Sequence, residues 1–172
     1  MLDDALESHC MMCVGTLTQN ETDDPADCTA KTGTIGLIRV SKEQEDGRSN
    51  LILHGILRVD FTNWLDENEY PYAEIEPSPS VPIPDDEIDQ VKAALQDALY
   101  SALKHFPDAI VDRIKKSLAQ VDSSSSALAD VVAQQFVVDP DKRRALLEEP
   151  DVKKRFEMLT REIGHADWGS SN

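Results

Sequence analysis

The residues with the clearest potential for chemistry are three cysteines near the start of the chain. Cys10 and Cys13 form a C-x-x-C pair, His9 precedes the pair, and Cys28 lies in the next polar stretch. A structural zinc site needs about four converging ligands. The C-x-x-C pair lies in an apolar, strand-like stretch, where residues three apart point to opposite faces. We therefore expect these cysteines to act as small buried hydrophobic residues, with no metal bound.

Motifs for nucleotide binding and covalent catalysis are the next possibility. The sequence has no G-x-x-x-x-G-K-[ST] loop and no G-x-S-x-G elbow. Serines 123–126 are typical of a loop that ends in a helix cap, and the acidic runs at 85–87 and 148–149 flank expected helix ends. We expect no catalytic residue, no cofactor, no ATPase loop and no Ser–Lys peptidase dyad, so that the chain by itself is not an enzyme.

A group of apolar and aromatic residues remains as a candidate binding surface. Trp64, Leu65, Tyr70 and Tyr72 lie at or just after the end of a long predicted strand, and Met11 lies in the first apolar stretch. Such side chains either pack against the sheet, which is the commoner role, or form an exposed apolar platform. We select these five residues as candidate contacts for a bound polypeptide.

The charge balance limits the partners. The 172 residues include 33 acidic and 17 basic ones, which gives a net charge of −16. A field of this sign repels phosphate backbones and anionic lipids, so we expect neither a nucleic-acid nor a membrane partner. No apolar run approaches the ~20 residues of a membrane span, and the acidic first residues do not resemble a signal peptide. We expect a cytoplasmic protein whose acidic surface favours basic or partly unfolded polypeptides.

The first half of the chain has strand and turn patterns. We expect strands at residues 10–18, 33–44, 48–61 and 72–76, and a polar loop at 20–31. Asp46-Gly47 predicts a hairpin because this pair tolerates positive φ angles. In the return strand, apolar and polar residues alternate with a period of two, and a glycine on the apolar face predicts a bend or bulge. That face consists of Leu51, Leu53, Gly55, Leu57, Val59 and Phe61.

The second half has the apolar spacing of helices. A proline-rich segment, 77–84, separates it from the strands, because proline lacks an amide donor and disfavours helix before it. Four apolar stripes with steps of three and four follow, and Gly164 is expected as the last C-cap. We expect a β-rich subdomain at 1–77, a connector at 78–84, a helical subdomain at 85–164 and a disordered tail at 165–172. The stripes are headed by Ile88-Val91-Leu95, Ile110-Ile114-Leu118, Leu128-Val132-Phe136 and Val152-Phe156-Leu159.

Several segments together resemble the N-terminal substrate-binding domain of Lon proteases. The opening residues 1–17 look like a helix and strand of that family, and Gly33–Ile38, Asp46–Leu51 and Gly55–Val59 match its Gly-started strand, D-G turn and G-x-x-R segment. Pro71–Glu76 looks like its next strand. Near the end, segments 128–130, 139–148 and 152–156 resemble its helical signature. The match covers almost the whole chain in the family's order.

The resemblance implies an α+β fold, with a curled, antiparallel, PUA-like β subdomain followed by a helical bundle. The family starts with a strand segment that this sequence does not show, so we expect the first strands to be missing. The resemblance also implies recognition of unfolded or damaged polypeptides without catalysis. Three alternatives stay open: an adaptor that docks on a separate ATP-dependent protease, a part of an ATP-dependent serine protease that is active only in the complete enzyme, and a small hydrolase with an unrecognised site.

Overall fold

The computed structural model describes residues 1–18, 20, 22–65, 70–121, 124–166 and 168. The chain forms two compact units, Met1–Pro79 and Ser80–Asn172. Among the described residues, the four strands lie in the first unit, and the regular elements of the second unit are helices. The prediction of a β-rich first half and a helical second half is therefore confirmed.

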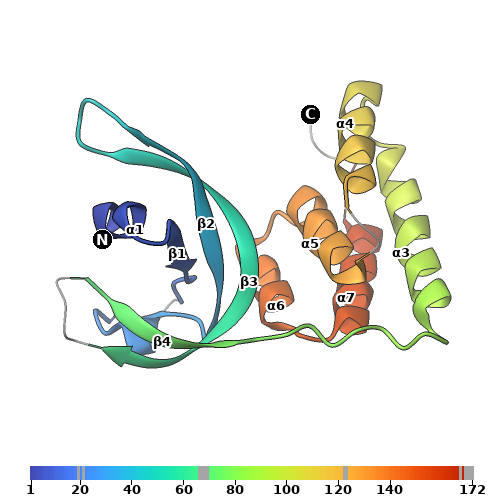
Figure 1. Ribbon diagram of the computed structural model, residues 1–172. Coiled ribbons are helices and arrows are strands. Elements are labelled where there is room, and N and C mark those ends of the chain that lie inside the picture. Colours follow the sequence, from blue (N-terminus) through green and yellow to red (C-terminus); the bar gives the residue numbers. More distant parts are fainter. Residues whose placement is uncertain (19, 21, 66–69, 122–123, 167, 169–172) are drawn as a thin grey trace. The chain divides into compact units, whose positions relative to one another are not determined.

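A single antiparallel sheet organises the first unit, the β unit. Its strands are β1 (Met11–Val14), β2 (Thr32–Glu43), β3 (Ser49–Leu65) and β4 (Tyr72–Pro77), in the order β1-β2-β3-β4. The predicted hairpin joins β2 to β3, and Gly47 at its turn has a φ of 81°, which favours glycine. Figure 1 shows that this long hairpin curves, with helix α1 (Leu2–Glu7) and β1 on its concave side.

Bulges in β3 account for part of the curvature. Leu57 pairs with Ile35, whereas Gly55 pairs with the next residue of β2, so that Ile56 is an extra residue. The bulge predicted at this glycine is thus confirmed. A second bulge lies between Phe61 and Asn63, where β3 pairs with β4. Each extra residue increases the local twist, which helps a flat sheet to curl.

Two local predictions in the β unit were wrong. The first strand is shorter than expected, because Cys10 has a φ of 53° and its amide bonds to Ala5 O at 2.7 Å, so this residue ends the preceding helical turn. The region predicted as a loop contains a short helix, α2 (Pro25–Cys28). Asp24 caps this helix by accepting a hydrogen bond from Ala26 N, and Asp24-Pro25 is a typical helix-start signal.

Five helices form the second unit, the helical unit. They are α3 (Ile88–Leu103), α4 (Asp108–Ala119), α5 (Ser125–Phe136), α6 (Pro140–Glu148) and α7 (Val152–His165). The predicted stripes supply its core, because buried residues from all five helices form one apolar cluster. Side chains of Ser124, Asp139 and Asp151 cap α5, α6 and α7 by accepting hydrogen bonds from amides of the first turn.

The last residues differ from the prediction. Gly164 is not a cap but lies inside α7, which ends at His165 with Ala166 as its C-cap. Trp168, which was expected in a disordered tail, packs against Phe106 and Phe136 and donates a hydrogen bond from Nε1 to Ile163 O. Its burial follows from its large apolar ring, which the helical core can cover. The other residues of that tail beyond 166 lie outside the described part of the chain.

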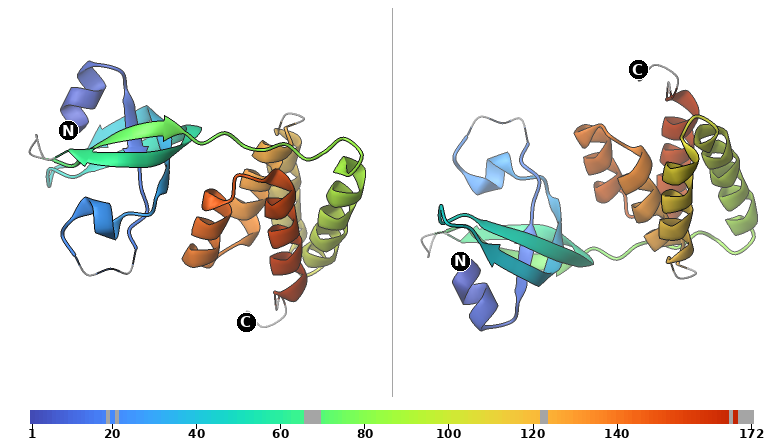
Figure 2. Two further views of the ribbon diagram at one scale, coloured as in Figure 1. Left: turned by 90° about the horizontal axis from the view of Figure 1, so that it is seen from below. Right: turned by 90° about the horizontal axis from the view of Figure 1, so that it is seen from above.

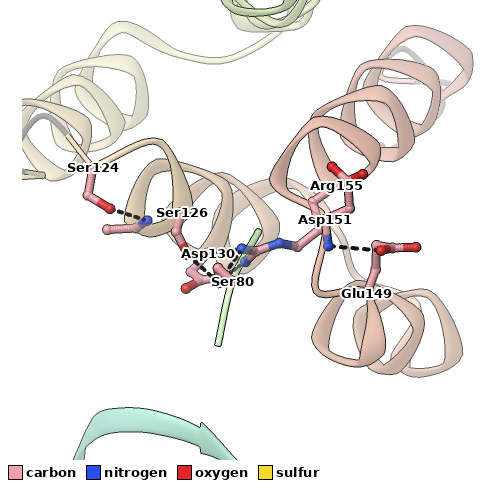
Figure 3. A network of polar contacts seen from close by, with 8 residues as sticks. Ser80, Ser124, Ser126, Asp130, Glu149, Asp151 and Arg155 are labelled. Atoms are coloured by element: carbon pink, nitrogen blue, oxygen red, sulfur yellow. Dashed lines mark hydrogen bonds and ion pairs between the residues drawn. The ribbon is translucent and has the colours of Figure 1, made fainter. Parts of the chain in front are cut away.

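A polar network inside the helical unit surrounds Arg155, whose side chain is only 1% exposed (Figure 3). Its guanidinium donates to Asp130 Oδ1 at 2.8 Å and to Ser80 Oγ and Ser126 Oγ, both at 2.9 Å. Ser80 begins the unit, and nearby Val81 pairs with Asp151. The network therefore ties the segment before α3 to α5 and α7.

Among the residues that the structure describes, no helix combines the length and the apolar character needed to cross a bilayer.

Candidate functional site

An open pocket of about 720 Å³ occupies the β unit. The views in Figure 2 show α1 and α2 on opposite sides of the strands, and both helices contribute to the pocket wall. Each strand of the sheet contributes as well. The apolar and sulfur-containing side chains in the lining are Met1, Ala5, Met11, Met12, Cys13, Leu17, Pro25, Cys28, Ile35, Phe61, Trp64, Pro71, Ala73 and Ile75.

The aromatic floor of the pocket depends on the second bulge in β3. Phe61 and Trp64 are three residues apart, a spacing that normally puts side chains on opposite faces of a strand. The bulge between them restores a common face, and their ring centroids lie 5.1 Å apart. Their partners in β4, Ile75 and Ala73, line the pocket with them. Two strands thus present one continuous apolar surface to the pocket.

A chain of hydrogen bonds closes one side of the pocket. Tyr70 donates from its hydroxyl to Asp4 Oδ2 at 2.6 Å, and the hydroxyls of Tyr70 and Tyr72 lie 2.9 Å apart. Because the single Tyr70 proton is used on the carboxylate, Tyr72 is the donor in the second bond. This chain links α1 to the start of β4 across 66 positions of sequence.

The electrostatics of this side follow from the same contacts. The hydrogen bond from Tyr70, followed by the nearby amino group of Met1, lowers the pKa of Asp4. The hydrogen bond to Asp4, followed by that from Tyr72, raises the pKa of Tyr70 well above its usual range. At neutral pH the pair is therefore a carboxylate and a neutral phenol, an arrangement that positions groups but supplies no acid or base for catalysis.

The five candidate contacts have different places in the structure. Met11, Trp64, Tyr70 and Tyr72 line the pocket, whereas Leu65 is not among the lining residues. Leu65 follows Trp64 directly in β3, and side chains of neighbouring strand residues point to opposite faces. The structure thus brings together four of the five residues around one pocket.

Other lining residues were not selected from the sequence. Phe61, Met12, Ile75 and Leu17 fall within predicted strands, but the sequence analysis gave them no binding role. Leu17 is 72% exposed although it is large and apolar, which is unusual for a packing residue. Alternation along a strand assigns apolar residues to one face of that strand, but it does not show that these residues meet residues of other strands at one pocket.

The cysteines and histidines show no ligand set. All three cysteines are unpaired, and only Cys13 and Cys28 line the pocket. Partial loss of contact with water raises the pKa of the Cys13 thiol, so the thiol is neutral at physiological pH. In the part of the chain that the structure describes, no three His, Cys, Asp or Glu side chains converge as a metal site would require.

One S-x-x-K spacing was overlooked in the sequence. Ser101 and Lys104 lie at the C-terminal end of α3 in the helical unit, and both side chains are exposed to water. A lysine that activates a serine needs an environment that withholds water from its ammonium group. The exposed pair does not provide that environment.

Comparison with known structures identifies the fold. The N-terminal domain of a Lon protease from the Mycobacterium avium complex superposes with a TM-score of 0.67 at 18% sequence identity, over 91% of each chain. A Lon N-terminal domain protein from Xanthomonas campestris gives a TM-score of 0.56 at 16% identity, over 93% of this chain and 80% of that one. The class is therefore an α+β domain with the architecture of Lon N-terminal domains.

The sequence comparisons identify the family. A Lon protease from Desulfosudis oleivorans is 26% identical over 133 residues, which are 77% of this chain and only 16% of that protease. Residues 1–165 match the family described as the ATP-dependent protease La (LON) substrate-binding domain, and the chain belongs to that family. The resemblance noted in the sequence is thus confirmed.

Proposed function

We propose that the pocket of the β unit binds apolar segments of unfolded or damaged polypeptides. The observation that carries the proposal is the convergence of exposed aromatic, aliphatic and sulfur-containing side chains on one open pocket. Clusters of exposed apolar side chains on a single domain typically mark binding surfaces. Membership of a substrate-binding family supports the same role.

The chemistry of the lining suits a binder of varied sequences. Methionines at 1, 11 and 12 have flexible, polarisable side chains that adapt to different partners, and the aromatic rings offer large rigid surfaces. A flexible client loses conformational entropy when it docks, so that each contact contributes only weakly. We therefore expect micromolar rather than nanomolar affinity for a single segment.

Binding of a denatured protein to the full chain tests this proposal. A reduced, alkylated protein carrying a fluorophore should bind, as measured by anisotropy, while its native form should not. Leu17→Ser should weaken binding about five- to thirtyfold, because it removes an exposed side chain whose burial contributes roughly 1–2 kcal/mol. The matched control is Ile52→Ser, which changes a 61% exposed side chain of the same unit outside the pocket lining. Equal effects of the two substitutions, with folding intact by circular dichroism, would refute the proposal.

We also propose that the chain recognises clients without cleaving them. The match to a family described as a substrate-binding domain supports this, as does the fact that the chain matches only 16% of the related Lon protease. Incubation of highly purified chain with casein and ATP should give neither peptide products nor phosphate. An associated Lon-type protease, recovered by pull-down, would identify the chain as an adaptor for that enzyme.

The proposal includes a cytoplasmic location. Three unpaired cysteines support it, because thiols persist in reducing compartments. Cell fractionation checks this point.

A further inference from the structure

The negative charge of the protein is concentrated in the unit that contains the pocket. Residues 1–79 include 16 acidic and 5 basic residues, a net charge of −11 out of the −16 of the whole chain. The remaining residues, although more numerous, have a net charge of only −5. The acidic character is therefore a property of the binding unit rather than of the whole surface.

Acidic residues lie at the pocket on two of its sides, at α1 and in the segment around α2. Asp4 of α1 and Asp23, just before α2, belong to the pocket lining. Their neighbours in sequence include four more exposed acidic residues, Asp3, Glu7, Asp24 and Asp27. In β4, Glu74 and Glu76 are exposed but alternate with Ala73 and Ile75, which line the pocket, so these two carboxylates belong to the other face of the strand. The apolar interior is thus bordered by carboxylates at α1 and at the segment around α2.

The basic residues of the β unit lie elsewhere. Lys31 pairs with Asp60 at 3.4 Å and Arg48 pairs with Asp46 at the hairpin turn, and neither cation lines the pocket. The three other basic residues of the unit, in β2 and β3, are also absent from the lining. The amino group of Met1 is the cation of the lining, and it lies 3.1 Å from the Asp4 carboxylate. The surroundings of the pocket therefore attract positive charge.

We propose that the pocket selects polypeptide segments in which an apolar or aromatic side chain is flanked by lysine or arginine. This inference rests on the proposed function and adds the class of substrate. The apolar side chain enters the pocket, and the flanking cations remain in water beside the carboxylates of α1 and the α2 region. Long basic side chains suit this arrangement, because their aliphatic stems cover apolar surface while their charged ends stay hydrated.

Three synthetic peptides test the selectivity with the full-length chain. They share one central Leu-Phe-Leu sequence and carry lysine, serine or glutamate on both sides. Fluorescence anisotropy at low salt should show the lysine peptide binding about tenfold more tightly than the serine peptide, with the glutamate peptide weakest. The ratio of the affinities for the lysine and serine peptides should fall to about twofold as the salt concentration rises from about 0.01 to about 1 M, because the screening length falls from ~30 to ~3 Å.

A pair of substitutions locates the effect at the pocket. Asp23→Asn removes an exposed carboxylate from the lining and should reduce the lysine-to-serine ratio about two- to threefold, the size expected for one solvated charge pair. Glu43→Gln removes the same charge from the far end of β2, outside the lining, and should leave the ratio unchanged. Both substitutions preserve the size of the side chain.

The outcomes separate this inference from the proposed function. If all three peptides bind equally and Leu17→Ser still weakens them, selectivity for flanking cations is refuted while binding in the pocket stands. If only the lysine peptide binds and Leu17→Ser has no effect, the attraction is a general one to an acidic surface and the inference is wrong. If no peptide binds, both ideas fail.

Discussion

Removal of the carboxylate beside Arg155 is predicted to destabilise the helical unit more than removal of the arginine itself. The guanidinium is buried, whereas the Asp130 side chain is 61% exposed. Asp130→Asn keeps the size of the side chain but removes the carboxylate that lies 2.8 Å from the buried guanidinium. Breaking a buried ion pair in this way is costly, because the remaining charge cannot recover its hydration.

The magnitude follows from the geometry. Two unit charges about 4 Å apart interact with about 4 kcal/mol at the effective dielectric constant of ~20 found near protein surfaces. Because Asp130 is mostly exposed, water screens roughly half of this energy, which leaves about 2 kcal/mol. For a unit of this size, about 90 residues, such a loss lowers Tm by roughly 8–16 °C.

The opposite substitution should cost less. Arg155→Met replaces the buried cation with an apolar side chain, and Asp130 then returns to water. The hydroxyls of Ser80 and Ser126, 3.1 Å apart, retain their mutual hydrogen bond. Replacement of buried charges by apolar groups is often close to neutral, so we expect a loss of about 1 kcal/mol or less. The double variant should be no less stable than Arg155→Met alone.

Thermal and urea unfolding, followed by circular dichroism at 222 nm, measure these effects. Asp112→Asn serves as the control, because it removes an exposed carboxylate from α4 of the same unit. The reasoning is refuted if Asp130→Asn behaves like this control, or if Arg155→Met is the more destabilising of the two.

Three further predictions concern single residues. Gly33→Ala should destabilise the β unit by about 1–3 kcal/mol in urea unfolding, because the new Cβ would lie 2.7 Å from both a ring carbon of Phe61 and the carbonyl oxygen of Val14. Gly55→Ala is the control and should cost less than half as much, because its Cβ would have one contact, at 3.5 Å. Asp151→Ala should lower stability by about 1 kcal/mol through loss of two capping hydrogen bonds, and Asp151→Ser should restore most of it. Tyr70→Phe should raise the carboxyl pKa of Asp4 toward its usual value, as measured by NMR titration. Because this pKa is lowered in the folded protein, the contact between α1 and Tyr70 stabilises the fold above the usual carboxyl pKa and weakens as the pH falls through the lowered value. An unchanged pKa in the variant would show that the contact is absent in solution.

Local patterns in the sequence were sufficient for most of the fold. Gly47 follows an aspartate at the hairpin turn and has the positive φ that the D-G signal predicts. In the helical unit, Leu95, Phe156 and Leu159 were selected by spacing alone and are buried. The turn and the helix stripes depend only on residues a few positions apart in the sequence, so local patterns are enough to predict them.

The pocket was less accessible to such reasoning, because it depends on register and long-range contacts. The bulge that puts Phe61 and Trp64 on one face is set by pairing with β4 and has no signal in the sequence. In a regular strand without this bulge, the two rings would lie on opposite faces. The contact of Tyr70 with Asp4 likewise joins distant parts of the chain, so the sequence could identify the aromatic residues but not their common site.

Photo-crosslinking at two tyrosines tests the central claim most directly. Tyr72 lines the pocket and is 41% exposed, whereas Tyr100 lies in α3 of the helical unit and is 73% exposed. Each is replaced in turn by a photoreactive phenylalanine, and the full chain is irradiated with a denatured protein. The account predicts strong crosslinks from position 72 that an excess of apolar peptide abolishes, and few from the more exposed position 100. Equal crosslinking from both positions, or stronger crosslinking from position 100, would contradict it.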